Sequence, residues 1–139
     1  MKVRAVAGGY LVRLERGEDI VEKLTVLTTE HDIPCGIVSG IGAVKNVELG
    51  YFDTIAGIYR RRSIPDTVEL VNLAGNISYL DSRPFVHVHA VVADSEQKLL
   101  GGHLFKGAVA VTAEVYIQVI DTRLDRARDN QTGYNIWDL

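Results

Sequence analysis

The spacing of apolar residues changes at Pro34 from a helical to a strand pattern, and that change limits the possible folds more than any other feature. Before Pro34, buried-type residues recur at the three- and four-residue spacing of an amphipathic helix. They are Ile20, Leu24, Leu27 and Thr28. The segment Gly17, Glu18 and Asp19 suits the start of that helix, because the helix dipole favours negative charge in the first turn. After Pro34 the spacing becomes the two-residue alternation of strands, with turn residues about every 8 to 12 residues.

The two-residue alternation, which also occurs before the helix, predicts a succession of short strands. They cover residues 1–14 (broken at Gly8 and Gly9), 35–39, 44–52, 58–63, 68–74, 76–80, 85–93, 99–104 and 109–122. The connections are too short for helical crossovers, so neighbouring strands should be antiparallel. We predict an α+β fold, a mostly antiparallel sheet flanked by one helix in the N-terminal half. The 139 residues correspond to one domain, 1–139, with a core over about 9–122 and a polar tail at 123–139.

Composition narrows the possible functions. The net charge of −3 argues against a domain that binds nucleic acid by neutralising phosphates, since such domains carry a basic excess. Cys35 is the only cysteine, which excludes an internal disulfide and a zinc site made of cysteine pairs. No apolar run reaches the roughly 18 residues of a membrane span. Gly8 and Gly9 interrupt the apolar segment that a signal peptide needs, so we expect a cytoplasmic protein.

Three of the four histidines fall within residues 87–103, and they form the main candidate site. His87 and His89 are two apart in an expected strand, so both side chains point to one face. A three-residue loop before the next strand would place His103 opposite His89, whereas a loop of two or four residues would place it opposite Val88. Either register brings three imidazoles together. Three neutral imidazoles suit a divalent transition metal and leave a position open for water or substrate.

The spacing leaves more than one interpretation of this cluster open. His87, His89 and His103 could bind zinc or another divalent transition metal. They could equally line a pocket or a subunit interface that contains no metal. A cupin-like oxygenase also begins with a His-x-His pair, but the second, downstream histidine motif of such enzymes fits this chain poorly.

Other polar residues are candidates to complete the site. Glu114 lies on the polar face of its strand, where it could be a fourth ligand, a partner of a ligand or a general base, or simply an exposed carboxylate. Asn76 shares a strand face with Ser78, and Ser39 precedes a glycine-rich segment. We therefore take Ser39, Asn76 and Glu114 as candidates for lining a ligand pocket.

Two further features have simple structural interpretations. Cys35 follows Pro34 in an apolar stretch and fits a buried small residue better than a nucleophile. The run Arg60, Arg61 and Arg62 can place at most two arginines on one face of a strand. It therefore fits an edge strand protected by charge better than a phosphate-binding patch.

Several short stretches, taken in order, resemble the PPC (plants and prokaryotes conserved) domain, which plants fuse to AT-hook DNA-binding motifs. The matching segments are residues 9–18 (GYLVRLERGE), 38–43 (VSGIGA), 49–52 (LGYF), 73–78 (LAGNIS), 84–89 (PFVHVH), 101–104 (GGHL) and 112–115 (TAEV). The resemblance implies an α+β fold that assembles as a homotrimer. It also implies that His87, His89 and His103 form a metal site, with zinc the first candidate, near a subunit boundary.

The chain departs from the plant members in one respect that bears on function. No Arg-Gly-Arg-Pro core of an AT-hook is present, and no basic arm precedes Gly8. DNA binding would therefore rest on the family resemblance alone, and the net charge does not support it.

Two classes of function follow from the sequence. The first is a trimeric regulatory or binding module that carries a three-histidine metal site. The alternative is a metal-dependent enzyme or small-ligand binder that uses the same histidines, with Glu114 as the base.

Overall fold

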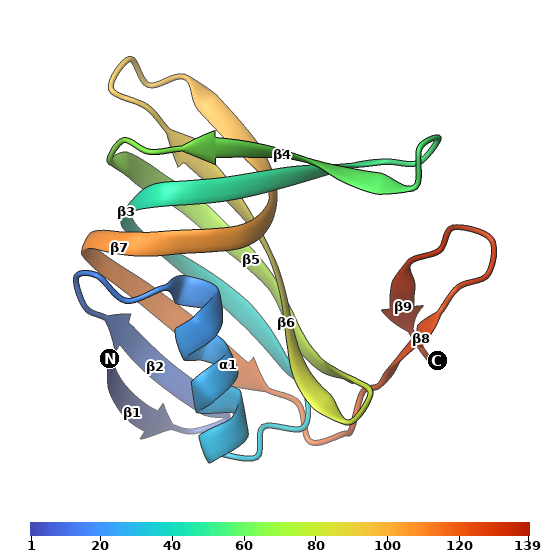
Figure 1. The fold of residues 1–139 in the computed structure, drawn as a ribbon. Coiled ribbons are helices and arrows are strands. Elements are labelled where there is room, and N and C mark those ends of the chain that lie inside the picture. Colours follow the sequence, from blue (N-terminus) through green and yellow to red (C-terminus); the bar gives the residue numbers. More distant parts are fainter.

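The computed structural model describes residues 1–139 and contains one helix and nine strands (Figure 1). The helix α1 spans Ile20–Glu30. The strands are β1 (Lys2–Val6), β2 (Gly9–Leu14), β3 (Gly36–Asp53), β4 (Ile58–Ile64), β5 (Val68–Leu80), β6 (Arg83–Ala93), β7 (Leu99–Val119), β8 (Arg126–Arg128) and β9 (Asn135–Trp137). The change from helix to strands at Pro34 is as predicted.

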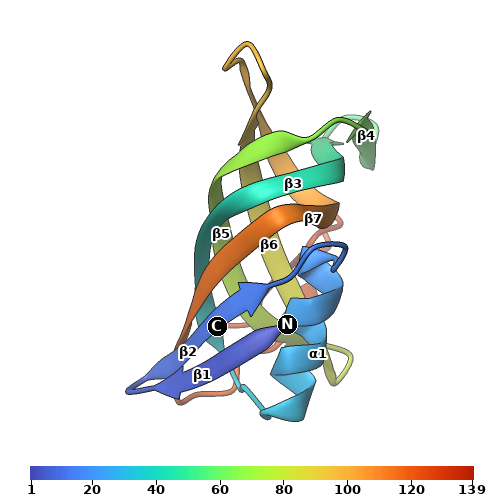
Figure 2. The ribbon, with the colours of Figure 1, turned by 90° about the vertical axis from the view of Figure 1, so that its left-hand side faces the viewer.

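Seven of the strands form one antiparallel sheet in the order β1-β2-β7-β6-β5-β3-β4. Strand β7 pairs with β6 through its first residues and with both β2 and β3 further along. Because β3 also pairs with β5, and β5 with β6, strands β3, β5, β6 and β7 close into a ring. Figure 2 shows these strands curving around one another. The predicted fold class, a mostly antiparallel sheet with one helix, is confirmed.

Strands β3 and β5 are longer than predicted, because glycines expected to interrupt them lie inside continuous strands. β3 runs through Gly40 and Gly42 with a bulge between them, and β5 runs through Gly75. A Cβ atom at Gly42 would lie 2.3 Å from the backbone oxygen of Thr112, and one at Gly75 would lie 2.0 Å from that of His87. These glycines allow neighbouring strands to approach closely and do not form turns.

The helix packs its apolar face against β6 and β7 (Figure 1). Its buried residues are the four that the periodicity singled out, Ile20, Leu24, Leu27 and Thr28. The three apolar ones, Ile20, Leu24 and Leu27, belong to a core of 23 buried side chains from both sides of Pro34. At the start of the helix, the Asp19 side chain accepts a hydrogen bond from the backbone N–H of Glu22 and another from that of Gly107 on β7. This carboxylate therefore caps the helix and ties it to the sheet.

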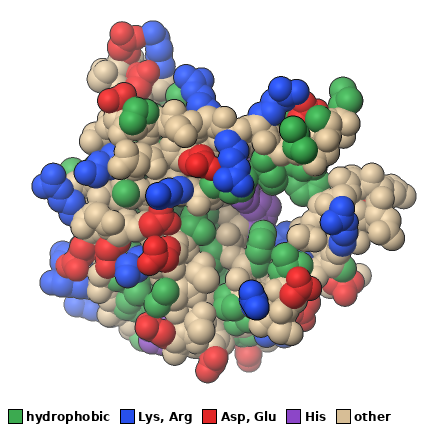
Figure 3. Space-filling model, viewed as in Figure 1, with side chains coloured by type: hydrophobic (Ala, Val, Ile, Leu, Met, Phe, Trp, Pro, Cys, Tyr) green, Lys and Arg blue, Asp and Glu red, His purple; other side chains and the backbone are tan.

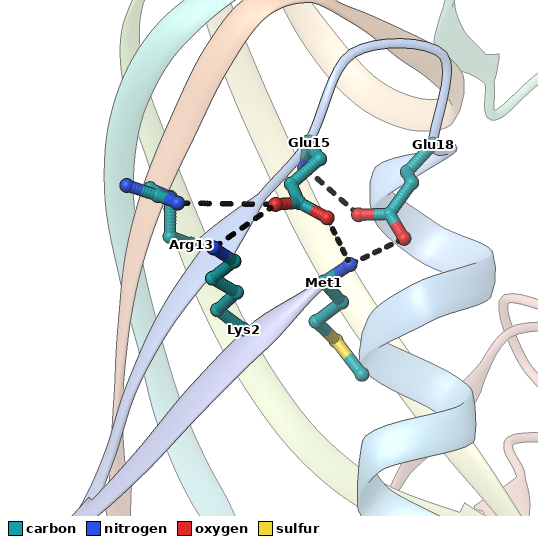
Figure 4. Close-up of polar contacts among 5 residues, drawn as sticks. All are labelled: Met1, Lys2, Arg13, Glu15 and Glu18. Atoms are coloured by element: carbon teal, nitrogen blue, oxygen red, sulfur yellow. Dashed lines mark hydrogen bonds and ion pairs between the residues drawn. The ribbon is translucent and has the colours of Figure 1, made fainter.

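A group of charged residues joins the first strands to the beginning of the helix (Figure 4). The Met1 ammonium lies 2.6 Å from a carboxylate oxygen of Glu18 and 3.2 Å from one of Glu15. Glu18 also accepts a hydrogen bond from the backbone N–H of Glu15. The contact with Glu18 raises the pKa of the Met1 amine. Lys2 and Arg13 lie more loosely around Glu15, at 3.9 and 3.8 Å.

The arginine run and Cys35 occupy the positions that the sequence predicts for them, an edge strand and the interior. Strand β4 is at the edge of the sheet, and its Arg60 and Arg61 pair with Asp53 and Glu48 of the adjacent β3. Cys35 is buried, and burial raises the pKa of its thiol. The chain contains no helix that is both long enough and apolar enough to cross a membrane.

Candidate metal centre

The two strands that carry the histidines are direct neighbours in the sheet. His87 and His89 lie on β6, and the register of the β6–β7 pair sets His103 opposite His89. This is the pairing predicted for a three-residue loop. Val88 is fully buried, so the side chains on either side of it point to the outer face of the sheet. Ligand nitrogens of all three rings lie within 4.8 Å of one another. The structure therefore brings the three predicted histidines together.

The histidines lie in a hollow of the surface between two protruding hairpins (Figure 3). One hairpin is formed by β3 and β4, and the other contains β8 and β9 (Figure 1). Aromatic rings line the side next to His103: the ring centre of Tyr59 is 5.2 Å from that of His103, and that of Phe105 is 4.5 Å away. Tyr134 reaches across from the C-terminal hairpin to Phe52, with ring centres 4.0 Å apart. The site thus combines three imidazoles with an aromatic wall.

The environment of one nitrogen atom, Nδ1 of His103, shows whether the cluster suits a metal. The Nδ1 atom of His103 is buried and has no hydrogen-bond partner in the protein. A buried polar atom without a partner costs free energy, which binding of its lone pair to a cation would offset. Imidazole nitrogens are ligands that zinc, copper, iron and nickel accept, and three protein ligands leave a coordination position open. These residues therefore fit a divalent transition metal.

The protonation states of the rings also suit metal binding. Burial, with the nearby charges of Arg126 and the other two histidines, lowers the pKa of His87 from 6.5 to about 4. Burial, with the charges of His89 and Arg61, lowers the pKa of His103 to about 4 as well. Both rings are then neutral at pH 7. A metal can bind their lone pairs without first displacing a proton.

These shifts predict how the stability of the metal-free protein depends on pH. Between pH 6.5 and about 4 the unfolded chain binds protons that folded His87 and His103 exclude. We therefore expect the free energy of unfolding to be highest above pH 6.5 and to fall continuously as the pH is lowered towards 4. Urea denaturation at intervals across this range would measure it. A His103→Gln variant should show a shallower decline, and an equally steep one would contradict this origin.

The three other candidate residues divide between two regions. Asn76 belongs to the site, because β5 pairs it directly with His87. Ser39 and Glu114 do not belong to it. Glu114 pairs with Arg13 and Ile41, in the part of β7 that no longer pairs with β6. Ser39 and Glu114 instead line a separate groove on the outer face of β2, β3 and β7. The structure thus places no Glu114 base beside the histidines.

The sequence did not indicate the contribution of the C-terminal tail. Arg126, on β8, extends its guanidinium to Asn76, Ser78 and His87, with donor–acceptor distances of 2.8, 2.7 and 3.2 Å. In the sequence it is one arginine of a polar tail, with no periodicity or motif around it. Ser78, by contrast, shares its strand face with Asn76, which the alternation of β5 does predict.

Three solved structures resemble this fold over nearly its whole length. A "putative DNA-binding protein" from Bacteroides thetaiotaomicron is 27% identical, with a TM-score of 0.95, 99% of this chain covered and 96% of the other. A plant- and prokaryote-conserved (PPC) protein from Pyrococcus horikoshii is 29% identical, with a TM-score of 0.88 and coverage of 99% and 94%. A metal-containing protein from Archaeoglobus fulgidus is 32% identical, with a TM-score of 0.86 and coverage of 98% and 94%.

A curated relative is similar in sequence over part of its length. The bifunctional protein GlmU of a Synechococcus strain is 27% identical over 128 residues, which are 90% of this chain and 19% of that protein. This chain therefore spans about a fifth of the relative.

The family model of the Plants and Prokaryotes Conserved domain matches residues 1–121. This match spans the helix, the seven-stranded sheet and all three histidines. It ends before β8, so Arg126 and the C-terminal hairpin lie outside it. The chain belongs to the Plants and Prokaryotes Conserved (PPC) domain family.

Proposed function

We propose that this PPC domain is a self-associating binding module that holds one divalent transition metal, zinc in the first place, on His87, His89 and His103. The observation that carries the proposal is the convergence of three imidazoles, with one ligand nitrogen from each within 4.8 Å of the others; in addition, the buried Nδ1 of His103 has no hydrogen-bond partner. The metal-containing relative from Archaeoglobus fulgidus supports it. Bound there, a metal would act as a Lewis acid towards whatever occupies its open position.

The metal content of the protein purified without an affinity tag or chelator tests this proposal. We expect close to one equivalent of zinc per chain by elemental analysis. His89→Ala and His103→Ala should each weaken zinc binding by at least about 100-fold, because they remove a direct ligand. His31→Ala is the matched control, since this fourth histidine stands at the end of α1, away from the cluster. Absence of metal from the wild type, or unchanged binding in His103→Ala, would refute the proposal.

Self-association is supported by apolar side chains on the outer face of the sheet. Ile41 of β3 is 58% exposed and Val111 of β7 is 69% exposed, and both line one shallow groove. Leu11 of β2, which pairs with Tyr116 of β7, continues the apolar surface into the adjacent groove. Connected apolar patches of this kind are commonly covered by another protein chain. We propose that the second and third copies of a homotrimer cover it.

Light scattering on the eluted peak of a sizing column tests the assembly. We expect a mass three times the 15.3 kDa of one chain. Ile41→Glu should reduce it to the monomer mass, because a carboxylate would be buried without a partner in the interface. Ile55→Glu, at the 98% exposed tip of the β3–β4 hairpin, is the control and should leave the trimer intact. A wild-type monomer would overturn this part of the proposal.

Neither DNA binding nor catalysis by Glu114 is favoured by the geometry. Two of the three arginines of β4, Arg60 and Arg61, are already paired with Asp53 and Glu48. With a net charge of −3, little positive charge is free to neutralise a nucleic acid. An enzyme working at the histidines would need a base other than Glu114, which lines the separate groove.

A further inference from the structure

The guanidinium of Arg126 is the one cation whose hydrogen bonds reach the histidine cluster. Its Nε donates to the Ser78 hydroxyl at 2.7 Å, and one Nη atom donates to the backbone oxygen of Asn135 at 2.8 Å. The other Nη atom lies 2.8 Å from the Asn76 side-chain oxygen and 3.2 Å from Nδ1 of His87. Arg126 is therefore held in a fixed position beside a proposed metal ligand.

The contact between Arg126 and His87 cannot persist unchanged when His87 binds a metal. Arginine can only donate hydrogen bonds, so in this contact Nδ1 of His87 supplies its lone pair. A neutral imidazole has a single nitrogen lone pair available in the ring plane. If a metal takes the lone pair at Nδ1, the arginine loses its acceptor. If the ring instead binds through Nε2, Nδ1 carries a hydrogen that faces the arginine N–H. Metal binding therefore leaves an N–H of Arg126 without an acceptor.

The site supplies no negative charge to replace that acceptor. The titratable groups that act on His87 are Arg126 and the two other histidines, and those that act on His103 are His89 and Arg61. No carboxylate is among them. The carboxylates of the neighbouring hairpin, Asp53 and Glu48, are paired with Arg60 and Arg61. A divalent metal on three neutral imidazoles would thus stand beside a partly buried guanidinium without a protein anion between them.

We propose that the site binds its metal together with a small oxyanion, and that Arg126 pairs with this anion. The inference rests on the proposed metal site and adds the class of its ligand. A carboxylate or phosphate oxygen has the charge that the cluster lacks and can accept the hydrogen bond that His87 gives up. The hollow beside the histidines leaves an approach from solvent (Figure 3). The rings of Tyr59 and Phe105 provide an apolar wall for the rest of an organic anion.

Cobalt(II) provides the readout, because its visible absorption responds to a change in the ligand at the open position. The purified protein would be loaded with Co²⁺, freed of excess metal, and titrated with sodium acetate and, separately, with inorganic phosphate. We expect a saturable spectral change with at least one of them. The anion that binds more tightly shows whether carboxylates or phosphates are the preferred class. Absence of a spectral change with both, in protein that does bind cobalt, would overturn the inference while leaving the metal site standing.

Variants of Arg126 give the second test. Arg126→Gln should weaken anion binding by about 10- to 100-fold, the usual loss for a hydrogen bond to a charged group. It should also tighten cobalt binding in the absence of anions, since it removes a positive charge beside the metal. Arg126→Lys keeps the charge and should retain most of the anion affinity. Arg128→Gln, two residues along β8, is the matched control and should resemble the wild type in both measurements. Equal anion affinities in Arg126→Gln and Arg128→Gln would refute the role of Arg126.

Discussion

Replacing Gly75 by alanine should destabilise this domain by about 3 kcal/mol and weaken metal binding at the same time. Gly75 lies in the middle of β5, opposite Val88 of β6. An added Cβ would be 2.0 Å from the backbone oxygen of His87 and 2.7 Å from the Cα of Val88. Both are backbone atoms, so no side-chain rotation can relieve the overlap. The two strands must separate at the point where β6 presents His87 to the site.

The measurement is urea denaturation of metal-free protein together with zinc affinity from a competition titration. Gly107→Ala is the matched control, because its Cβ would meet nothing closer than 3.5 Å, which is an ordinary van der Waals distance. We expect the control to change either quantity little. If Gly75→Ala retained both the stability and the zinc affinity of the wild type, close contact of β5 with β6 would not be what positions His87.

The helix and strands of this fold could be predicted where the residues that determine them lie close together in the sequence. The helix, with Asp19 at its start and Pro34 after its end, depends on periodicity and capping that lie within one short segment. The breaks predicted at Gly40 to Gly42 and at Gly75 were wrong because a glycine has two uses in a sheet. It can form a turn, or it can let a neighbouring strand approach closely. Only the neighbouring strand, distant in sequence, decides between them.

The same distinction between local and distant signals applies to the residues of the candidate site. The two-residue spacing of His87 and His89, and the loop length that sets His103 opposite His89, are contained in one hairpin. Glu114 has the same alternation as a site residue, but its strand curves away from β6 to pair with β2 and β3. Arg126 reaches the histidines from a separate two-stranded element. Both outcomes depend on how β7 and the tail turn in space, which no local pattern encodes.

Leu24→Ala should be the converse of the glycine variant, with a large loss of stability and an intact metal site. Leu24 is fully buried in the middle of α1, and its removal leaves a cavity in the core that should cost about 3 to 4 kcal/mol. Val26→Ala on the same helix is the control, since Val26 is 37% exposed and should cost much less. Zinc affinity of the folded protein should match the wild type in both variants.

The helix packs on the inner face of the sheet, whereas the histidines project from the outer face, so their positions depend on strand pairing and not on helix packing. A parallel loss of zinc affinity in Leu24→Ala would show that the core behind β6 also holds the histidines in place.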